Sequence, residues 1–376
     1  KPISNTKNKT MQKNDFTVDI HHHITLRVMN TATSKEEISY WQPKHNTIIG
    51  TAAGNLIRQQ TKDIAKVSQT NLYAAAKGNV KILFDSLYPM EDGFFRMESL
   101  SQRLVGKKNA DTILRTITGM SENRLKEIRK NTDYFSKLQE HYECLLQAKG
   151  SSPDGKYRLE ISKNYEHLQK IMQEQENTLV IVPTIEGAHA FGCGSISNLK
   201  QDFETLRKNV TKNIATVKQW KYPPFFVNLA HHFWNQLSGH AASFKPPSNT
   251  ILTQEKGKNL GINSLGWRVI FELLTRENGR RMLIDIKHLS IKSRQEYYRF
   301  VIGYNRLNPS DNIPVICSHT GVSGFDTFRD ASKQKDRIKK MRDSKFNNWT
   351  LNLCNDDIRV ISVSYTHLTL PTNGCV

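Results

Sequence analysis

The stretch Thr178-Leu-Val-Ile-Val-Pro-Thr-Ile-Glu-Gly-Ala-His189 is the most informative part of the chain about its fold. Its continuous apolar run from Leu179 to Val182 is typical of a strand buried on both faces, as found in parallel sheets covered by helices. The run ends in a carboxylate, Glu186, and then in Gly187, which permits a sharp turn. Since burying a carboxylate is costly unless a cation or protons compensate it, this strand end indicates a site rather than a simple loop.

Short β-rich runs alternate with longer helical patterns along most of the chain, which predicts an α/β fold with a parallel sheet. The predicted strands are 16–20, 80–87, 178–185, 225–230, 281–286, 313–318 and 359–363. The predicted helices include 61–77, 196–219, 264–276 and 291–302, with Ser264 and Ser290 placed to cap the last two. Seven strands in this alternation favour a TIM-type (β/α)8 barrel over an open doubly wound sheet.

The flanks and one long connection depart from this rhythm. We expect residues 1–15 to be a disordered polar tail, residues 16–362 to form the barrel, and residues 94–176 to be a helical insertion in it. Residues 363–376 resemble a translated sequencing adapter and are predicted to be non-native, so the barrel would be truncated before its eighth strand. A natural β-like tail is the alternative.

Composition narrows the class of protein. The chain has 376 residues, of which 37% are hydrophobic and 24% charged, as in a globular protein, and it has no apolar run long enough for a membrane span. The formal charge of +19 comes from lysines and arginines spread along predicted helices, so we expect solvated surfaces and no nucleic-acid partner. The five cysteines form no CxxC pair and predict neither a disulfide framework nor a structural zinc site. The sequence slightly favours a cytoplasmic location over export and leaves open whether the chain forms a homodimer.

Acidic residues and histidines recur where successive predicted strands end. These ends read Asp19-Ile-His-His-His23, Glu186-Gly-Ala-His189, His231-His232, Asp285-Ile-Lys-His288 and Ser318-His319. In His21-x-His23 the strand alternation puts both imidazoles on one side, where they can chelate one metal ion. Glu186 can then give one oxygen to each of two ions, with His288 and His319 completing the second, and nitrogen and oxygen ligands of this kind suit zinc.

Two zinc ions (Zn²⁺) in such a site can share a bridging hydroxide at neutral pH and polarise a substrate carbonyl. No serine or cysteine nucleophile is then needed, and the chain has no GxSxG elbow to supply one. The pattern predicts a metal-dependent hydrolase.

The order of these motifs resembles the membrane (renal) dipeptidase family of zinc peptidases, in particular its bacterial relatives. The resemblance runs over roughly residues 16 to 360, and the stretches Asn263-Ser-Leu-Gly-Trp267, Met282 to Ser290 and Pro314 to Thr320 carry its most specific part. It implies that His21, His23, Glu186, His288 and His319 bind two zinc ions and that the substrate is a dipeptide. It further implies that His231 contacts the substrate and stabilises the tetrahedral intermediate, with His232 as the rival for that role, and that Arg329 pairs with the substrate carboxylate.

Two departures from the family pattern bear on activity. Many members have HxD after the first strand where this chain has HxH, and the family places a zinc-binding aspartate after an eighth strand, which we do not expect in this chain. This chain could therefore be an inactive fragment of an enzyme. Two other functions stay open on the sequence: a metal-dependent amide or lactam hydrolase on the same barrel, and a basic binding protein.

Overall fold

The structure is a computed structural model. It describes residues 16–31, 39–42, 70–95, 111, 114–115, 120–130, 133–244, 252–333 and 347–364. The predicted tail 1–15, most of the predicted helix 61–77 and nearly all of the tail 363–376 lie outside these ranges.

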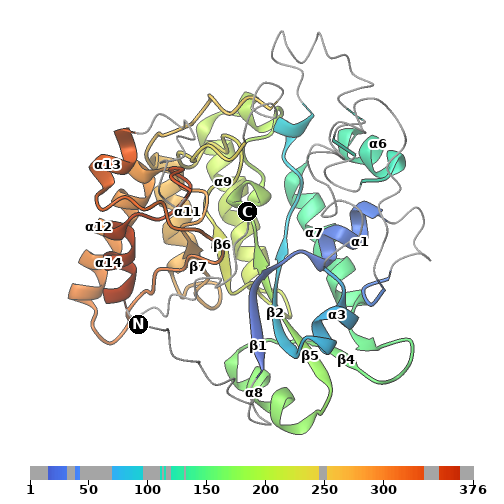
Figure 1. Cartoon of the computed structure of the whole chain (residues 1–376). Coiled ribbons are helices and arrows are strands. Elements are labelled where there is room, and N and C mark those ends of the chain that lie inside the picture. Colours follow the sequence, from blue (N-terminus) through green and yellow to red (C-terminus); the bar gives the residue numbers. More distant parts are fainter. Residues whose placement is uncertain are drawn as a thin grey trace, which may run out of the picture.

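A parallel sheet forms the centre of the molecule (Figure 1). Its strands follow one another in chain order as β1 (Thr17–His22), β2 (Val80–Leu87), β5 (Thr178–Ile185), β6 (Phe226–Asn228) and β7 (Leu283–Asp285). The longest pairing joins β2 to β5, with Ile82 opposite Val180 and Leu87 opposite Ile185. Every residue of β5 is buried, as its apolar run predicts. The predicted mixed α/β class with a parallel sheet is confirmed.

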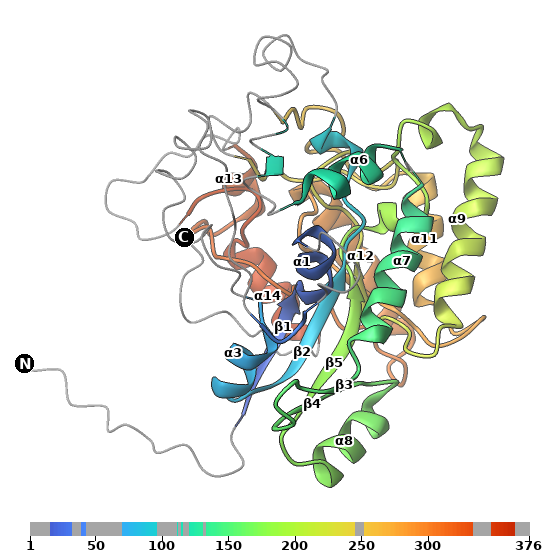
Figure 2. The same ribbon diagram turned by 90° about the vertical axis from the view of Figure 1, so that its right-hand side faces the viewer.

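Helices follow the strands along the chain and are arranged around the sheet (Figure 2). They are α1 (Ile24–Thr31), α3 (Leu72–Lys77), α7 (Tyr134–Gln147), α9 (Phe203–Lys218), α11 (Ser264–Leu274) and α12 (Ile291–Leu307). Ser290 caps α12 as predicted, because its side chain accepts the Ser293 N–H. The prediction that Ser264 caps α11 is wrong: the Asn263 side chain accepts the Gly266 N–H, and Ser264 is the first helical residue.

The sheet is open in the part of the chain that the structure describes. There β1 pairs only with β2, and β7 pairs only with β6 apart from an isolated bridge between Asp285 and Ile316. The predicted strand 313–318 is therefore reduced to this one bridge. Closure into a barrel stays a prediction.

The predicted strand 359–363 is wrong, because these residues end a helix, α14 (Asn355–Val363). The short run of β-branched residues has strand propensity, but Asp357 near the start of the helix accepts the Cys354 N–H. Asp357 is buried and paired with Arg294, and Ile361 lies one turn further along the same buried face. Tertiary contacts at helical spacing outweigh local strand propensity here. A short helix, α13 (Phe328–Lys333), precedes it and packs against α12.

The connection from β2 to β5 contains strands as well as helices. It includes η2 (Asp92–Phe94), α6 (Glu122–Lys130), α7, β3 (Gly150–Ser151), β4 (Arg158–Ile161) and α8 (Tyr165–Glu174). β4 pairs in parallel with the first half of β5, whereas β6 reaches β5 only at its end, where Ile185 faces Val227. Two 3-10 turns, η3 (Ala188–Phe191) and η4 (Asn198–Lys200), then lead from β5 into α9.

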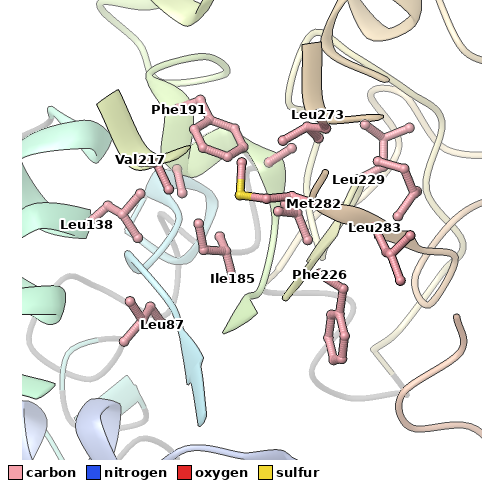
Figure 3. Packing of buried hydrophobic residues seen from close by; sticks show 14 of the residues in the cluster. Leu87, Leu138, Ile185, Phe191, Val217, Phe226, Leu229, Leu273, Met282 and Leu283 are labelled. Atoms are coloured by element: carbon pink, nitrogen blue, oxygen red, sulfur yellow. The ribbon is translucent and has the colours of Figure 1, made fainter. Parts of the chain in front are cut away.

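The core lies between the sheet and these helices (Figure 3). Leu138 of α7, Ile185 of β5 and Leu273 of α11 are fully buried in one cluster. Burying a side chain of this size stabilises the fold by about 1.5–3 kcal/mol. The four cysteines that the structure describes are buried free thiols. Among the described helices, we find none with the length and apolar character needed to cross a membrane.

Candidate metal centre

The carboxyl ends of the central strands bring the predicted ligands together. His21 lies in β1 and His23 directly follows it, Glu186 follows β5, and His231 and His288 come three residues after β6 and β7. His319 ends the segment that bridges to β7 at Ile316. The His21 and His319 rings stack with centroids 3.7 Å apart, so the first and last of these strand ends meet across the site.

Glu186 is the centre of this cluster. Its carboxylate is 3% exposed, and five imidazole Nε2 atoms face it. His23 lies 2.9 Å from Oε2. The other four nitrogens face Oε1 at 3.3–3.5 Å and belong to His21, His231, His288 and His319.

The histidines approach one another in pairs as metal ligands do. The Nε2 atoms of His21 and His23 are 3.0 Å apart, and those of His288 and His319 are 3.3 Å apart. With Zn–N bonds of about 2.0–2.1 Å in a tetrahedral arrangement, two ligand nitrogens are separated by about 3.3 Å. Each pair also forms a three-atom group with Glu186 within 4.8 Å, so these His/Glu clusters could hold a metal.

Burial sets the protonation of these ligands. Burial lowers the pKa of His21 and of His288 to about 3, and it lowers that of His319 well below its usual value. At His23 burial also lowers the pKa, but the Glu186 carboxylate outweighs it and raises this pKa above its ordinary value. Burial acts in the opposite direction on Glu186, but the surrounding histidines outweigh it and hold the pKa of the carboxyl well below its ordinary range. Neutral imidazoles, as favoured at His21, His288 and His319, and an ionised carboxylate are the forms that bind a metal ion.

The structure separates the two rival histidines. The Nε2 atom of His231 faces Glu186, and its Nδ1 atom lies 2.6 Å from Glu91 Oε2. His232 instead places its Nδ1 atom 2.7 Å from the Ser243 hydroxyl. Burial lowers the pKa of His231, but Glu186 and Glu91 together outweigh it and raise this pKa to about 10. A third group of possible ligands, His231 with His232 and His288, thus has two members already engaged by other side chains.

Arg329 is not brought to the cluster in this structure. It is an exposed residue in the first turn of α13, and within the described ranges no contact joins it to the histidines. Its predicted role toward a substrate carboxylate stays a prediction.

Two backbone positions at the site take unusual conformations. Gly187 has φ +91°, where a Cβ would lie 2.3 Å from His189 Nδ1. His288 has φ +68°, which is rare for a residue with a side chain and costs of the order of 1 kcal/mol. The buried carboxylate of Asp285 braces this region, because its Oδ1 atom accepts the N–H groups of Lys287 and Ser318, the residues before His288 and His319.

Sequence reasoning missed Glu91. It lies four residues beyond β2, is 3% exposed, and touches His231. The rule that pointed to the other ligands, an acidic residue just past the end of a buried strand, applies to it too. Glu91 was not predicted because it lies further from the end of its strand than the other candidates do.

No model of a known protein family matches this chain, and no curated protein matches it. Among solved structures, the chain is similar to the probable dipeptidase PvdM from Pseudomonas aeruginosa, at 12% identity and a TM-score of 0.41 over 80% of this chain and 53% of that one. It is also similar to dipeptidase AC, a metallopeptidase of family M19, at 12% identity and a TM-score of 0.44 over 94% of this chain and 71% of that one. The chain thus spans about half the length of the PvdM structure. At this distance, function has to be argued from the site itself.

Proposed function

We propose that this chain is a metal-dependent hydrolase whose centre holds two zinc ions and whose substrate is a dipeptide. The observation that carries the proposal is the single buried carboxylate of Glu186 with five imidazole Nε2 atoms within 3.5 Å. Packing alone does not explain why five histidines surround one carboxylate, because burying an imidazole removes its hydration and costs free energy.

The donor set favours zinc over the harder divalent cations. Magnesium and calcium prefer shells made of oxygen atoms, whereas zinc binds imidazole nitrogen together with carboxylate oxygen. We assign His21 and His23 to one ion and His288 and His319 to the other, with Glu186 shared between them. When bound, zinc would supply Lewis-acid polarisation of a peptide carbonyl and acidification of a water molecule.

The remaining residues act on the substrate. His231 would present its Nε2 atom to the reacting carbonyl and stabilise negative charge there as a hydrogen-bond donor. His232 is the weaker candidate, because its ring is held by Ser243. Arg329 would pair with the free carboxylate of a dipeptide, because a guanidinium can form a bidentate hydrogen-bonded ion pair with a carboxylate.

The test is metal content together with turnover on the full chain. The purified protein should bind about two zinc ions and hydrolyse simple dipeptides, and a chelator should abolish both. His288→Ala should lower the zinc content and the rate, whereas the matched change His167→Ala should alter neither, since His167 lies on α8 and contacts Lys163. Full zinc occupancy without turnover across a broad dipeptide panel would refute the substrate, and absence of bound zinc would refute the centre.

Two alternatives have distinct outcomes. A metal-dependent amide or lactam hydrolase would use the same ligands, and faster turnover of cyclic amides than of dipeptides would favour it. A basic binding protein is suggested by the charge of +19. Salt-dependent retention of nucleic acid by the metal-free protein would favour that function.

A further inference from the structure

A second buried carboxylate, Glu91, stands behind the proposed centre. It is 3% exposed and four donors surround it. The Tyr88 hydroxyl lies 3.0 Å from Oε2, and the Phe233 N–H lies 3.0 Å from Oε1. The His232 N–H and the His231 Nδ1 atom approach Oε2 at 3.4 Å and 2.6 Å.

These contacts decide which nitrogen of His231 faces the proposed centre. An ionised carboxylate only accepts hydrogen bonds, so the Nδ1 atom of His231 must carry a proton to bind Glu91. The Nε2 atom then remains for the site, and it faces Glu186 Oε1 at 3.4 Å. The edge-to-face contact between the His231 and Tyr88 rings, with centroids 4.6 Å apart, packs the imidazole from the side.

Glu91 also fixes the loop that carries His231. Glu91 follows β2, while the amides it binds belong to the two residues directly after His231 in the loop beyond β6. One side chain therefore sets the position of the backbone at residues 232–233 and the orientation of the neighbouring ring. Glu160 on β4 offers a contrast, because that buried carboxylate is paired with Lys149 and Arg158 and contacts no histidine of the centre.

We propose that Glu91 is a positioning residue that holds the His231 ring by its Nδ1–H group, so that Nε2–H is the ring donor presented to the substrate. The inference rests on the proposed function, because it gives His231 its task there. A carboxylate that orients an imidazole commonly contributes about 10- to 100-fold to activity at metal sites.

The first experiment needs no activity measurement. In ¹⁵N-labelled wild-type protein, metal-loaded and metal-free, NMR correlations of the His231 ring should show a proton on Nδ1, which Glu91→Gln should weaken or shift. A ring of His231 with Nδ1 unprotonated in the wild type would overturn the proposal. Because this readout does not depend on hydrolysis, it separates failure of this inference from failure of the dipeptidase assignment.

The second experiment is a double-mutant cycle in kinetics. Glu91→Gln should lower kcat about 10- to 100-fold with a smaller change in KM and unchanged zinc content. In a His231→Ala background, Glu91→Gln should cause no further loss, because a residue that acts through His231 has nothing left to orient. The matched change Glu160→Gln should leave kcat as in the wild type. If the losses in kcat multiplied in the double variant, or if Glu160→Gln lowered kcat as much as Glu91→Gln, Glu91 would have a general structural role and the proposal would be overturned.

Discussion

Gly187 is the position where the backbone of the site is least able to accept a side chain. With φ +91° and ψ 112°, it lies outside the regions that residues with a Cβ adopt freely. An added Cβ would lie 2.3 Å from His189 Nδ1 and 3.2 Å from His231 Cβ. The His189 ring cannot easily move away, because its Nε2 atom lies 2.7 Å from the Pro89 carbonyl oxygen in a buried environment.

The expected cost of Gly187→Ala has two parts. The backbone part is about 1–3 kcal/mol for a residue forced into a sparsely populated region. The contact with His189 adds about 1–3 kcal/mol, the usual penalty for an extra carbon in a packed interior. We therefore expect the free energy of unfolding to fall by about 4 kcal/mol.

Two other glycines provide matched controls. Gly155 also has positive φ, at +70°, but a Cβ added there would have nothing within 4 Å, so Gly155→Ala measures the backbone part alone, about 1–2 kcal/mol. Gly303 lies inside α12 with open space around it, so Gly303→Ala should stabilise the protein by about 0.5–1 kcal/mol.

The measurement is urea unfolding of the three variants, followed by circular dichroism and by tryptophan fluorescence, with midpoints compared at an unchanged slope. Gly187→Ala should also reduce dipeptide turnover, since relief of the contact displaces Glu186 or His231. If Gly187→Ala cost no more than Gly155→Ala, the close approach to His189 would not constrain the site, and this explanation of the glycine would be wrong.

Three further predictions concern a helix cap, a buried ion pair and a buried lysine. Asn263→Ala should lower the free energy of unfolding by about 1 kcal/mol and Ser264→Ala by less than about 0.5 kcal/mol, because Asn263 provides the cap of α11; equal costs in a denaturant titration would argue against this. Arg294→Met should cost about 3–5 kcal/mol, because it leaves Asp357 buried without its cation, and thermal unfolding of the variant would reveal it. Burial lowers the pKa of Lys137 to about 8, so its charged form is penalised in the folded protein and the free energy of unfolding should rise between about pH 8 and pH 10.5. Lys137→Met should remove that rise when unfolding is measured across this pH range. If the free energy of unfolding of the variant rose with pH as steeply as that of the wild type, Lys137 would not be its cause.

The strands that carry the site, and the residue types at their ends, can be read from the sequence alone. The run of Leu179 to Val182 predicts a strand buried on both faces, and β5 has the bounds of the predicted strand, 178–185. The ligand candidates followed from a local rule, since the carboxyl ends of parallel strands meet at one edge of the sheet. Glu186 and the histidines at the ends of β1 and β7 do converge there.

Which groups touch one another is a property of the folded chain. The choice between His231 and His232 depends on the turn after β6, because that turn brings the His231 Nε2 atom toward Glu186 and the His232 Nδ1 atom toward the Ser243 hydroxyl. Glu91 and His231 are 140 positions apart, and nothing local to either residue indicates the hydrogen bond between them. In the same way, the pairing of Asp357 with Arg294 fixes a helix where the local composition predicts a strand. Hydrogen bonds and ion pairs between distant segments form only after the strands have been placed side by side, and local sequence preferences carry no record of them.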